Sequence, residues 1–352
     1  GYGKQQNEAK LWDRYWPAAN SPMPDPLWPK ATEAKRAPNG YLYSMPIATG
    51  KSTEGRPPHF FDWAPDKQPE NQTADHKVVD WATSELSRKH SKPFFHAVGI
   101  FRPHIPWYAP QKYFDLYPED KVFLPKTQKD DLQDVPKHGH YGIRKQWHKW
   151  LVKNNEWRGA VRGYLASISF ADAQVGRLID ALDKSPHAKN TIIVLWSDHG
   201  MHIGEKQQWE KFTLFEESTR VPLIIAAPGI TKPGTVCDKP VNLLDAYPTL
   251  NELCNLPPRK NLDGVSLVKL LKNPKTKWER PAITTWGKGN HAARGQRYRY
   301  IRHPNGEEQL YDHQNDPDEF TNLADKPELA SVKKRLAKWL PKTNANAVRN
   351  KQ

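Results

Sequence analysis

The sequence predicts an α/β fold with a mostly parallel central sheet flanked by helices, followed by a small antiparallel α+β subdomain at the C-terminal end. Three observations support this prediction. A long amphipathic segment, about Arg158 to Lys184, leads through a short loop into the apolar run Thr191–Trp196. A helix joined in this way to a buried strand is typical of the right-handed crossover unit of parallel sheets. From about residue 282 the pattern changes to short alternating segments that favour a hairpin.

Three segments are expected to be helical. Apolar residues recur every three or four positions from Arg158 to Lys184, which makes this helix the clearest element. A shorter stripe from Val78 to Leu86 predicts a second helix, and Leu329 to Leu340 predicts a terminal helix that packs on its subdomain. The apolar run Pro93–Phe101 follows the second helix, and we expect it to be a buried strand.

The remaining strands set the predicted domain boundary. Leu223–Ala227 reads as a further core strand, and Ala282–Trp286 as the first strand of the next region. Residues 298–302 and 308–312 alternate on either side of a Pro-Asn-Gly turn and predict a hairpin. We therefore assign residues 1–281 to the α/β domain and residues 282–352 to a C-terminal subdomain. Residues 107–157 are polar, aromatic and basic, and are expected to be an insertion that shapes a substrate pocket.

The composition indicates an anionic partner. The 352 residues carry a formal net charge of +14 and contain no run of 18 apolar residues, so no membrane span is expected. Zinc-finger spacing, a helix-turn-helix and aromatic RNP patterns are absent, which argues against nucleic acid. A disulfide between the two cysteines, Cys237 and Cys254, is conceivable, but we expect both to be buried thiols.

Two short segments carry the chemistry. Thr191–Trp196 ends in Ser197-Asp198-His199-Gly200, a carboxylate and an imidazole at the carboxyl end of a strand, where open α/β sheets place their ligands. Lys211 follows, with Glu205 and Trp209 between, so the region offers an oxygen and a nitrogen for a cation and an ammonium for an anion. In Arg102-Pro103-His104-Ile105-Pro106 the prolines are expected to hold His104 in an extended loop.

These residues resemble the type I, formylglycine-dependent sulfatases of the alkaline phosphatase superfamily, and most closely the iduronate-2-sulfatase-like branch. The matching positions are Asp198-His199-Gly200, Gly204-Glu205, Trp209, Lys211 and Glu216-x-x-x-Arg220-Val221-Pro222. The resemblance implies an alkaline phosphatase/sulfatase-like fold and one Ca²⁺ ligated by Asp198, with His199 against the metal and the sulfate. It further implies that Lys211 binds the sulfate ester and that His104 protonates the leaving alcohol, a role that suits an imidazole.

The resemblance also suggests substrate contacts. Lys4 matches part of the family's Gly-Lys-x-x-His element, although Asn7 stands in place of the histidine. Arg102, His202, His291 and Arg294 complete the set of candidate substrate-binding residues, with a satisfied loop histidine an equal alternative for His291.

Two elements of the family are not found in the sequence. Neither cysteine lies in the Cys-x-Pro-Ser-Arg motif that yields formylglycine, and no serine version occurs. The Asp130-Asp131 pair follows a polar loop rather than a strand, so it does not match the family's calcium-binding Asp-Asp pair. We therefore expect the chain to be the C-terminal part of a sulfatase, with formylglycine on an upstream segment. By resemblance, the protein is expected to be extracytoplasmic (periplasmic, secreted or lysosomal) and to act on a sulfated poly- or oligosaccharide.

Two alternative functions stay open at this point. The first is a phosphodiesterase or phosphatase of the same superfamily, which would need two zinc ions and additional Asp and His ligands that the sequence does not assemble. The second is a catalytically inactive sulfatase-like protein that binds acidic glycans through its basic surface, an interpretation that the missing nucleophile favours.

Overall fold

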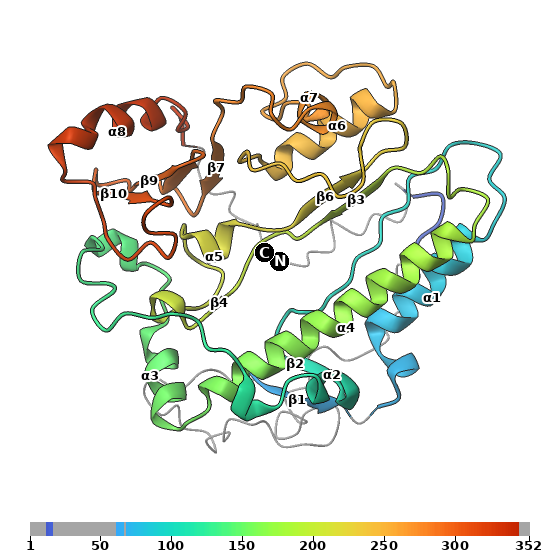
Figure 1. The fold of residues 1–352 in the computed structure, drawn as a ribbon, viewed down its shortest axis with the longest axis horizontal. Coiled ribbons are helices and arrows are strands. Elements are labelled where there is room, and N and C mark those ends of the chain that lie inside the picture. Colours follow the sequence, from blue (N-terminus) through green and yellow to red (C-terminus); the bar gives the residue numbers. More distant parts are fainter. Residues whose placement is uncertain (1–11, 17–60, 67, 345–352) are drawn as a thin grey trace, which may run out of the picture. The chain divides into compact units, whose positions relative to one another are not determined.

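A computed structural model describes residues 12–16, 61–66 and 68–344 of the chain. The chain divides into two compact units, which are described separately (Figure 1). The first unit contains residues 1–124 and 146–190, and the second contains residues 125–145 and 191–352. In the described part of the chain, no helix combines the length and the apolar character needed to cross a bilayer.

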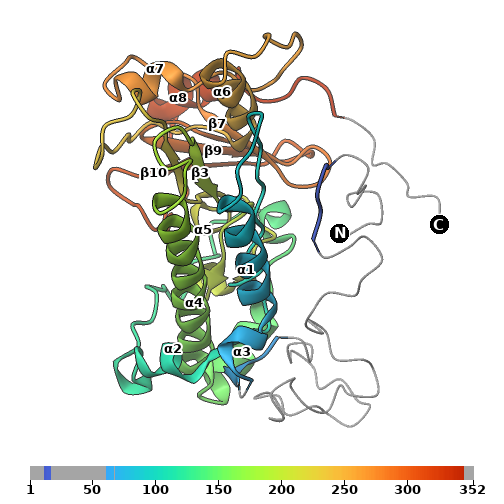
Figure 2. The same cartoon turned by 90° about the vertical axis from the view of Figure 1, so that its right-hand side faces the viewer.

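Two helices and a pair of strands organise the first unit. Its elements are β1 (Trp63–Asp66), α1 (Ala74–Leu86), β2 (Trp107–Pro110), α2 (Gln111–Asp115), α3 (Lys145–Lys153, which starts at the unit boundary) and α4 (Trp157–Asp183). Helices α1 and α4 run side by side in both views (Figures 1 and 2). The hydroxyl of Thr73 caps α1 by accepting from the backbone N–H of His76 at 3.4 Å.

Close packing fixes α4 against the strands of this unit. Strands β1 and β2 pair in parallel, with Trp63 opposite Trp107. A Cβ at Gly163 of α4 would lie 2.4 Å from the Cβ of Trp63, so only glycine lets the helix approach this closely. Phe61, Trp63 and Trp107 are buried and stack edge to face in the core of the unit.

The second unit is built from short strands and short helices. Its elements are β3 (Ile193–Trp196), β4 (His202–Ile203), β5 (Trp209–Glu210), α5 (Glu216–Thr219), β6 (Leu223–Ala226), α6 (Ala246–Leu253), α7 (Val268–Lys272), β7 (Ala282–Thr285), β8 (His291–Arg294), β9 (Tyr298–Arg302), β10 (Glu308–Asp312) and α8 (Ala330–Ala337). Strands β7 to β10 form an antiparallel sheet in the order β10-β9-β8-β7.

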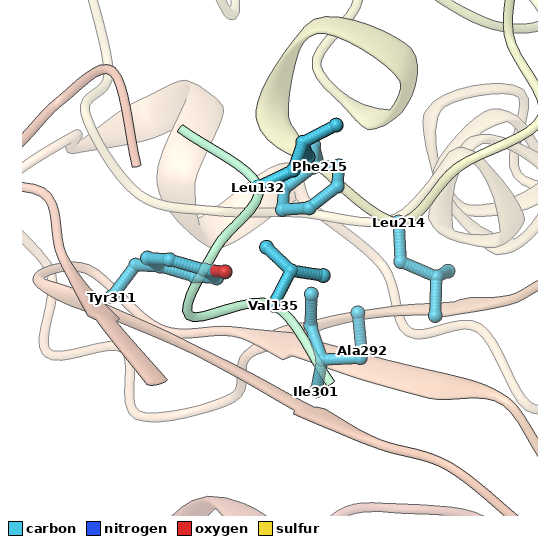
Figure 3. Close-up of a cluster of buried hydrophobic side chains, with 7 residues drawn as sticks. All are labelled: Leu132, Val135, Leu214, Phe215, Ala292, Ile301 and Tyr311. Carbon is cyan, nitrogen blue, oxygen red and sulfur yellow. The ribbon is translucent and has the colours of Figure 1, made fainter. Parts of the chain in front are cut away.

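A buried apolar cluster joins the antiparallel sheet to the preceding loops of the same unit. It contains Leu132, Val135, Leu214, Phe215, Ala292, Ile301 and Tyr311, whose side chains converge in Figure 3. On the other side of the sheet, Leu336 of α8 packs with Ala293, Tyr300 and Leu310. The sheet therefore has two apolar faces, which hold the C-terminal helix and the loops around residues 132 and 215 together.

The α/β class is confirmed, and most predicted elements are present. Helix α4 matches the segment predicted from Arg158 to Lys184, and α1 and α8 match the two shorter stripes. The predicted hairpin of residues 298–302 and 308–312 forms, with Leu310 opposite Tyr300. The proposed boundary between residues 281 and 282 coincides with the start of β7, and the division into two domains at that point stays a prediction.

Three predictions about strands and cysteines are wrong. Strands β3 and β6 pair antiparallel, and among the described residues only β1 and β2 pair in parallel. Between β3 and β6 the chain forms the β4–β5 pair and the four-residue helix α5, not the long helix that usually carries a crossover to a parallel strand. Residues 93–100 form no strand, because no described segment pairs with them, and Phe95 is 71% exposed. Cys237 and Cys254 are free and exposed rather than buried.

Candidate active site

The loop after β3 presents Asp198 to solvent. The Asp198 side chain is 76% exposed, and its Oδ1 accepts a hydrogen bond from the His199 backbone N–H at 3.0 Å. The His199 ring is anchored through Nδ1, which lies 2.7 Å from the carbonyl oxygen of Gly200, and its Nε2 lies 3.7 Å from Asp198 Oδ2. With Nδ1 donating to that carbonyl, the imidazole directs Nε2 toward the carboxylate. The loop therefore holds a carboxylate and an imidazole nitrogen next to each other.

Gly200 fixes this loop against α5. Its backbone N–H donates to the carbonyl oxygen of Ser218 at 2.9 Å. A Cβ at this position would lie 1.9 Å from the carbonyl oxygen of Glu217, far inside any allowed contact. Residue 200 must therefore be glycine because the loop backbone passes directly over the backbone of α5.

A two-stranded ribbon positions Lys211. Strands β4 and β5 pair antiparallel, with His202 opposite Glu210, and Lys211 follows directly after β5. The turn between them is closed by Glu205, whose Oε2 accepts from the backbone N–H of Ile203 at 2.8 Å. Glu210 adopts a left-handed backbone conformation with φ of 71°, which is uncommon for a residue with a side chain. The Lys211 ammonium lies 5.5 Å from the centre of the Phe212 ring.

Glu210 is a residue of this region that the sequence did not suggest. Its side chain is buried, with Oε2 located 2.7 Å from Arg144 Nε. Burial raises the pKa of Glu210, and electrostatic interactions with Arg144, Lys211 and His199 oppose that increase. Lys211 and His199 therefore both interact electrostatically with the Glu210 carboxylate. This carboxylate couples the loop after β3 to the end of β5. A glutamate beside a lysine in sequence carries no signal of such burial.

His202, in strand β4 of the ribbon, is fully buried. Its Nε2 lies 2.8 Å from the hydroxyl of Thr213, which in turn lies 2.9 Å from the hydroxyl of Ser218. Burial lowers the pKa of His202 to about 3, so the ring is neutral near pH 7. This position gives His202 a structural partner inside the protein.

His291 and Arg294, on β8, also have partners within the second unit. His291 is buried, with Nδ1 located 2.8 Å from Thr285 Oγ1 and Nε2 located 2.8 Å from Asn344 Oδ1. Arg294 donates through Nε to Glu216 Oε2 at 3.1 Å. The role of both residues as substrate contacts stays a prediction.

Glu216 belongs to a buried charge network that could be mistaken for a metal site. Among the described residues, Glu216, His313 and Glu319 form the one group of His, Cys, Asp and Glu side chains whose ligand atoms all lie within 4.8 Å of one another. The fully buried Arg299 donates to Glu216 and, through Nε at 2.5 Å, to Glu319. Burial alone would raise the pKa of Glu319, but Arg299 and His313 lower it to about 2. A guanidinium already occupies the position that a cation would need, so this network stabilises the fold.

In the first unit, His104 lies in a turn rather than in an extended loop. Its backbone N–H donates to the carbonyl oxygen of Phe101 at 3.0 Å, and its Nδ1 lies 2.6 Å from the carbonyl oxygen of Ile105. The ring also packs against Phe101, with 4.7 Å between the ring centres. Because Nδ1 is committed to the backbone, Nε2 is the nitrogen suited to carry a transferred proton.

Asp75, a second residue that the sequence did not suggest, anchors this turn. The buried carboxylate at the start of α1 accepts from the backbone N–H groups of Phe101 at 2.7 Å and Arg102 at 3.1 Å. Arg102 donates through Nε to the carbonyl oxygen of Tyr108 at 2.7 Å. The guanidinium of Arg102 therefore has a structural contact in addition to its predicted role. Lys4, the remaining candidate, lies outside the described residues.

Asp198 suits a hard cation, although it is only part of a site. Its exposed carboxylate oxygens are the type of ligand that Ca²⁺ takes, whereas the imidazole of His199 is not. Calcium binds six to eight oxygens, so Asp198 alone cannot hold it, and further oxygen ligands would have to join the carboxylate.

Comparison with solved structures defines the class of fold. The chain matches the phosphonate monoester hydrolase of Agrobacterium radiobacter with a TM-score of 0.67 and 22% identity, over 86% of this chain and 65% of that chain. It matches a structure in complex with its substrate D-glucosamine-2-N,6-O-disulfate with a TM-score of 0.62 and 22% identity, over 75% of this chain and 68% of that chain. The chain therefore shares the fold of these structures.

Sequence comparison identifies the family. The Sulfatase family model matches residues 41–256, and the model described as N-sulphoglucosamine sulphohydrolase, C-terminal, matches residues 204–346. A sulfatase of Formosa agariphila is 41% identical over 81% of this chain and 56% of its own length. Human iduronate 2-sulfatase is 32% identical over 68% of this chain and 44% of its own length. The chain belongs to the sulfatase family and spans about half the length of these relatives.

Proposed function

We propose that this chain is part of an enzyme that hydrolyses sulfate esters on a sulfated glycan. The observation that carries the proposal is that Lys211 and His199, the neighbour of Asp198, both interact electrostatically with the buried Glu210 in a chain of the sulfatase family. The proposal takes Asp198 as a carboxylate for a cation and Lys211 as an ammonium for an anion in one site. Sulfate ester cleavage needs such charges, because negative charge is spread over the sulfate oxygens in the transition state.

Each residue has a defined part in the proposal. Lys211 binds the sulfate oxygens and stabilises their charge. His104 donates a proton from Nε2 to the departing sugar oxygen, while its Nδ1 stays bound to the carbonyl of Ile105. Asp198 contributes to holding Ca²⁺, which supplies charge neutralisation of the sulfate when bound. His199 orients Asp198 and faces the sulfate. The proposal gives His202 and His291 no step in the reaction, because both side chains are buried, and their substrate contacts stay predictions.

The nucleophile is assigned to a segment outside this chain. Neither cysteine matches a formylglycine motif, and the chain spans only about half of its curated relatives. The proposal therefore expects the longer protein to carry formylglycine and the remaining calcium ligands, and the 352 residues alone to be nearly inactive.

The proposed substrate is a sulfated oligosaccharide that contains uronic acid. The proposed location of the protein is outside the cytoplasm. The family of the chain, its resemblance to the iduronate-2-sulfatase-like branch and its net charge of +14 support an anionic glycan. The relatives include an ulvan-active sulfatase of Formosa agariphila, 30% identical over 74% of this chain.

The test is to measure how much sulfate, phosphate or phosphonate the full-length protein releases from the corresponding esters. Sulfated uronic-acid oligosaccharides are compared with phosphate and phosphonate monoesters of matched alcohols, before and after calcium removal by a chelator. We expect sulfate release that is lost with calcium and restored on its addition. Faster release of phosphate or phosphonate would instead assign the site to the phosphonate monoester hydrolases that share the fold. No release from any ester by a protein that binds the oligosaccharide would leave glycan binding as its activity.

A further inference from the structure

Three aromatic rings in the second unit form a row that starts beside Lys211. The Phe212 ring lies 5.2 Å from the Trp286 ring, and Trp286 lies 6.2 Å from Tyr141, with interplanar angles of 34° for both pairs. Trp286 follows β7, whereas Tyr141 lies in the loop before α3, so distant parts of the sequence build the row. We call Tyr141, Phe212 and Trp286 the aromatic shelf. Tyr141 is 69% exposed, and with the Phe212 and Trp286 rings it forms a contiguous aromatic surface rather than a single exposed side chain.

The loop that carries Tyr141 is held in place by Gln208. The buried amide of Gln208 accepts from the backbone N–H of Arg144 at 2.6 Å and donates to the carbonyl oxygen of Gly142 at 3.2 Å. Gly142 has φ of +90°, and a Cβ there would lie 2.4 Å from the carbonyl oxygen of Phe212. The loop thus rests on the backbone beside Lys211 and requires glycine to do so. An exposed ring on a loop fixed in this way is preorganised for a ligand.

Trp286 gives the shelf a rigid base. It packs on the buried cluster of Leu132, Phe215 and Ile301, whose side chains Figure 3 shows. A small hollow lies beside the shelf and is lined by Trp286, Tyr141 and the polar side chains of His138, Asn290 and His303.

The charges along the shelf favour an anionic ligand. Lys211 and Arg144 both lie against the Phe212 ring, at 5.5 and 5.4 Å from its centre. Of the acidic groups of this area, Glu210 is buried and paired with Arg144, and Glu307 lies 3.6 Å from His138 and accepts from its backbone N–H. The row therefore has positive charge at its Phe212 end and an exposed ring, Tyr141, at the other end, which suits an oligosaccharide whose acidic group faces the cations.

We propose that the aromatic shelf binds the sugar residue next to the one whose sulfate is held by Lys211. The apolar C–H face of a pyranose stacks on an aromatic ring, while its acidic groups face the surrounding cations. The inference rests on the proposed function, since Lys211 marks where the sulfated residue lies. It makes the protein selective for oligosaccharides over monosaccharides, with Tyr141 as a specificity-determining residue.

The test uses the full-length protein and its Tyr141→Ala variant, with Tyr247→Ala on α6 as a control at another half-exposed tyrosine. The ligands are a tetrasaccharide of 2-O-sulfated uronic acid and hexosamine, and the corresponding sulfated monosaccharide. Affinity is measured by calorimetry and sulfate release by ion chromatography. We expect Tyr141→Ala to weaken tetrasaccharide binding about tenfold, with the monosaccharide unchanged and Tyr247→Ala without effect on either ligand.

The outcomes separate this inference from the proposed function. Unchanged tetrasaccharide affinity in Tyr141→Ala, or equal losses for both ligands, would overturn the shelf as a subsite even if sulfate is released. Failure of the wild-type protein to bind the tetrasaccharide would overturn it as well. If binding depends on Tyr141 but no ester is hydrolysed, the shelf stands and the proposed hydrolysis falls.

Discussion

Replacing Gly200 with alanine tests how tightly the Asp198–Gly200 loop is built. The new Cβ would start 1.9 Å from the carbonyl oxygen of Glu217, and real Cβ contacts essentially never fall below 3.0 Å. The obstructing atom belongs to the backbone, so it cannot rotate away, and the loop or α5 must move by about 1 Å. That shift also strains the hydrogen bond from Gly200 to Ser218. We expect a loss of about 1–3 kcal/mol in the free energy of unfolding, the usual cost of overpacking.

The same displacement should impair catalysis, because Asp198 and His199 move with the loop. A misplacement of about 1 Å costs on the order of a hundredfold in rate. Urea denaturation of the chain gives the stability, and sulfate release by the full-length protein gives kcat/KM. Gly176→Ala is the control, since a Cβ there meets nothing within 4 Å and should stabilise the exposed middle of α4 by roughly 0.5–1 kcal/mol. A Gly200→Ala protein with wild-type stability and activity within twofold of wild type would refute the reasoning.

Three further predictions concern the buried charges of the second unit. Arg299→Met should lower the free energy of unfolding by about 3–5 kcal/mol, because it leaves two buried glutamates without their partner. Arg297→Met, at the surface, is the control and should have a much smaller effect when both variants are measured by urea denaturation. Burial lowers the pKa of His202 to about 3, so the unfolded chain binds a proton between pH 6.5 and 3 that the folded chain does not. Stability should therefore fall as the pH decreases through that window, by up to about 1.4 kcal/mol per pH unit, and His202→Gln should flatten this dependence. Burial raises the pKa of Glu217 to about 8, so the folded chain keeps a proton that the unfolded chain releases between pH 4.5 and 8. Its contribution to stability should fall as the pH rises through that range, and an unchanged slope in Glu217→Gln would contradict this.

The sequence predicted the elements whose pattern is local. Helix α4 repeats its apolar residues over seven turns, and the β9–β10 hairpin combines alternation with a Pro-Asn-Gly turn, so both could be identified from neighbouring residues alone. The direction of β6 relative to β3 could not, because an apolar run indicates burial but not the orientation of its partner. The run at residues 93–100 has the composition of a strand, yet a strand forms only where another segment accepts its hydrogen bonds.

Some residues of the candidate site could likewise be predicted from local sequence patterns, and others could not. Asp198, Lys211 and His104 lie in contiguous motifs, and their types and spacing suggested their chemistry. Asp75 and Glu210 could not be found from the sequence, since their roles depend on burial and on partners that only the fold brings near. Resemblance to the family suggested His291 and Arg294 as substrate contacts, and the fold gives both side chains partners within the protein.

The most direct test of the account is the kcat/KM for sulfate release by the full-length protein carrying Lys211→Met. Lys275→Met, at an exposed lysine after α7, is the matched control. Because Lys211 is assigned to the charge that develops on sulfate, its loss should reduce kcat/KM by about 10²–10³, and the control should retain wild-type activity. Equal activity of the two variants would contradict the assignment of the sulfate to the β5 end of this chain.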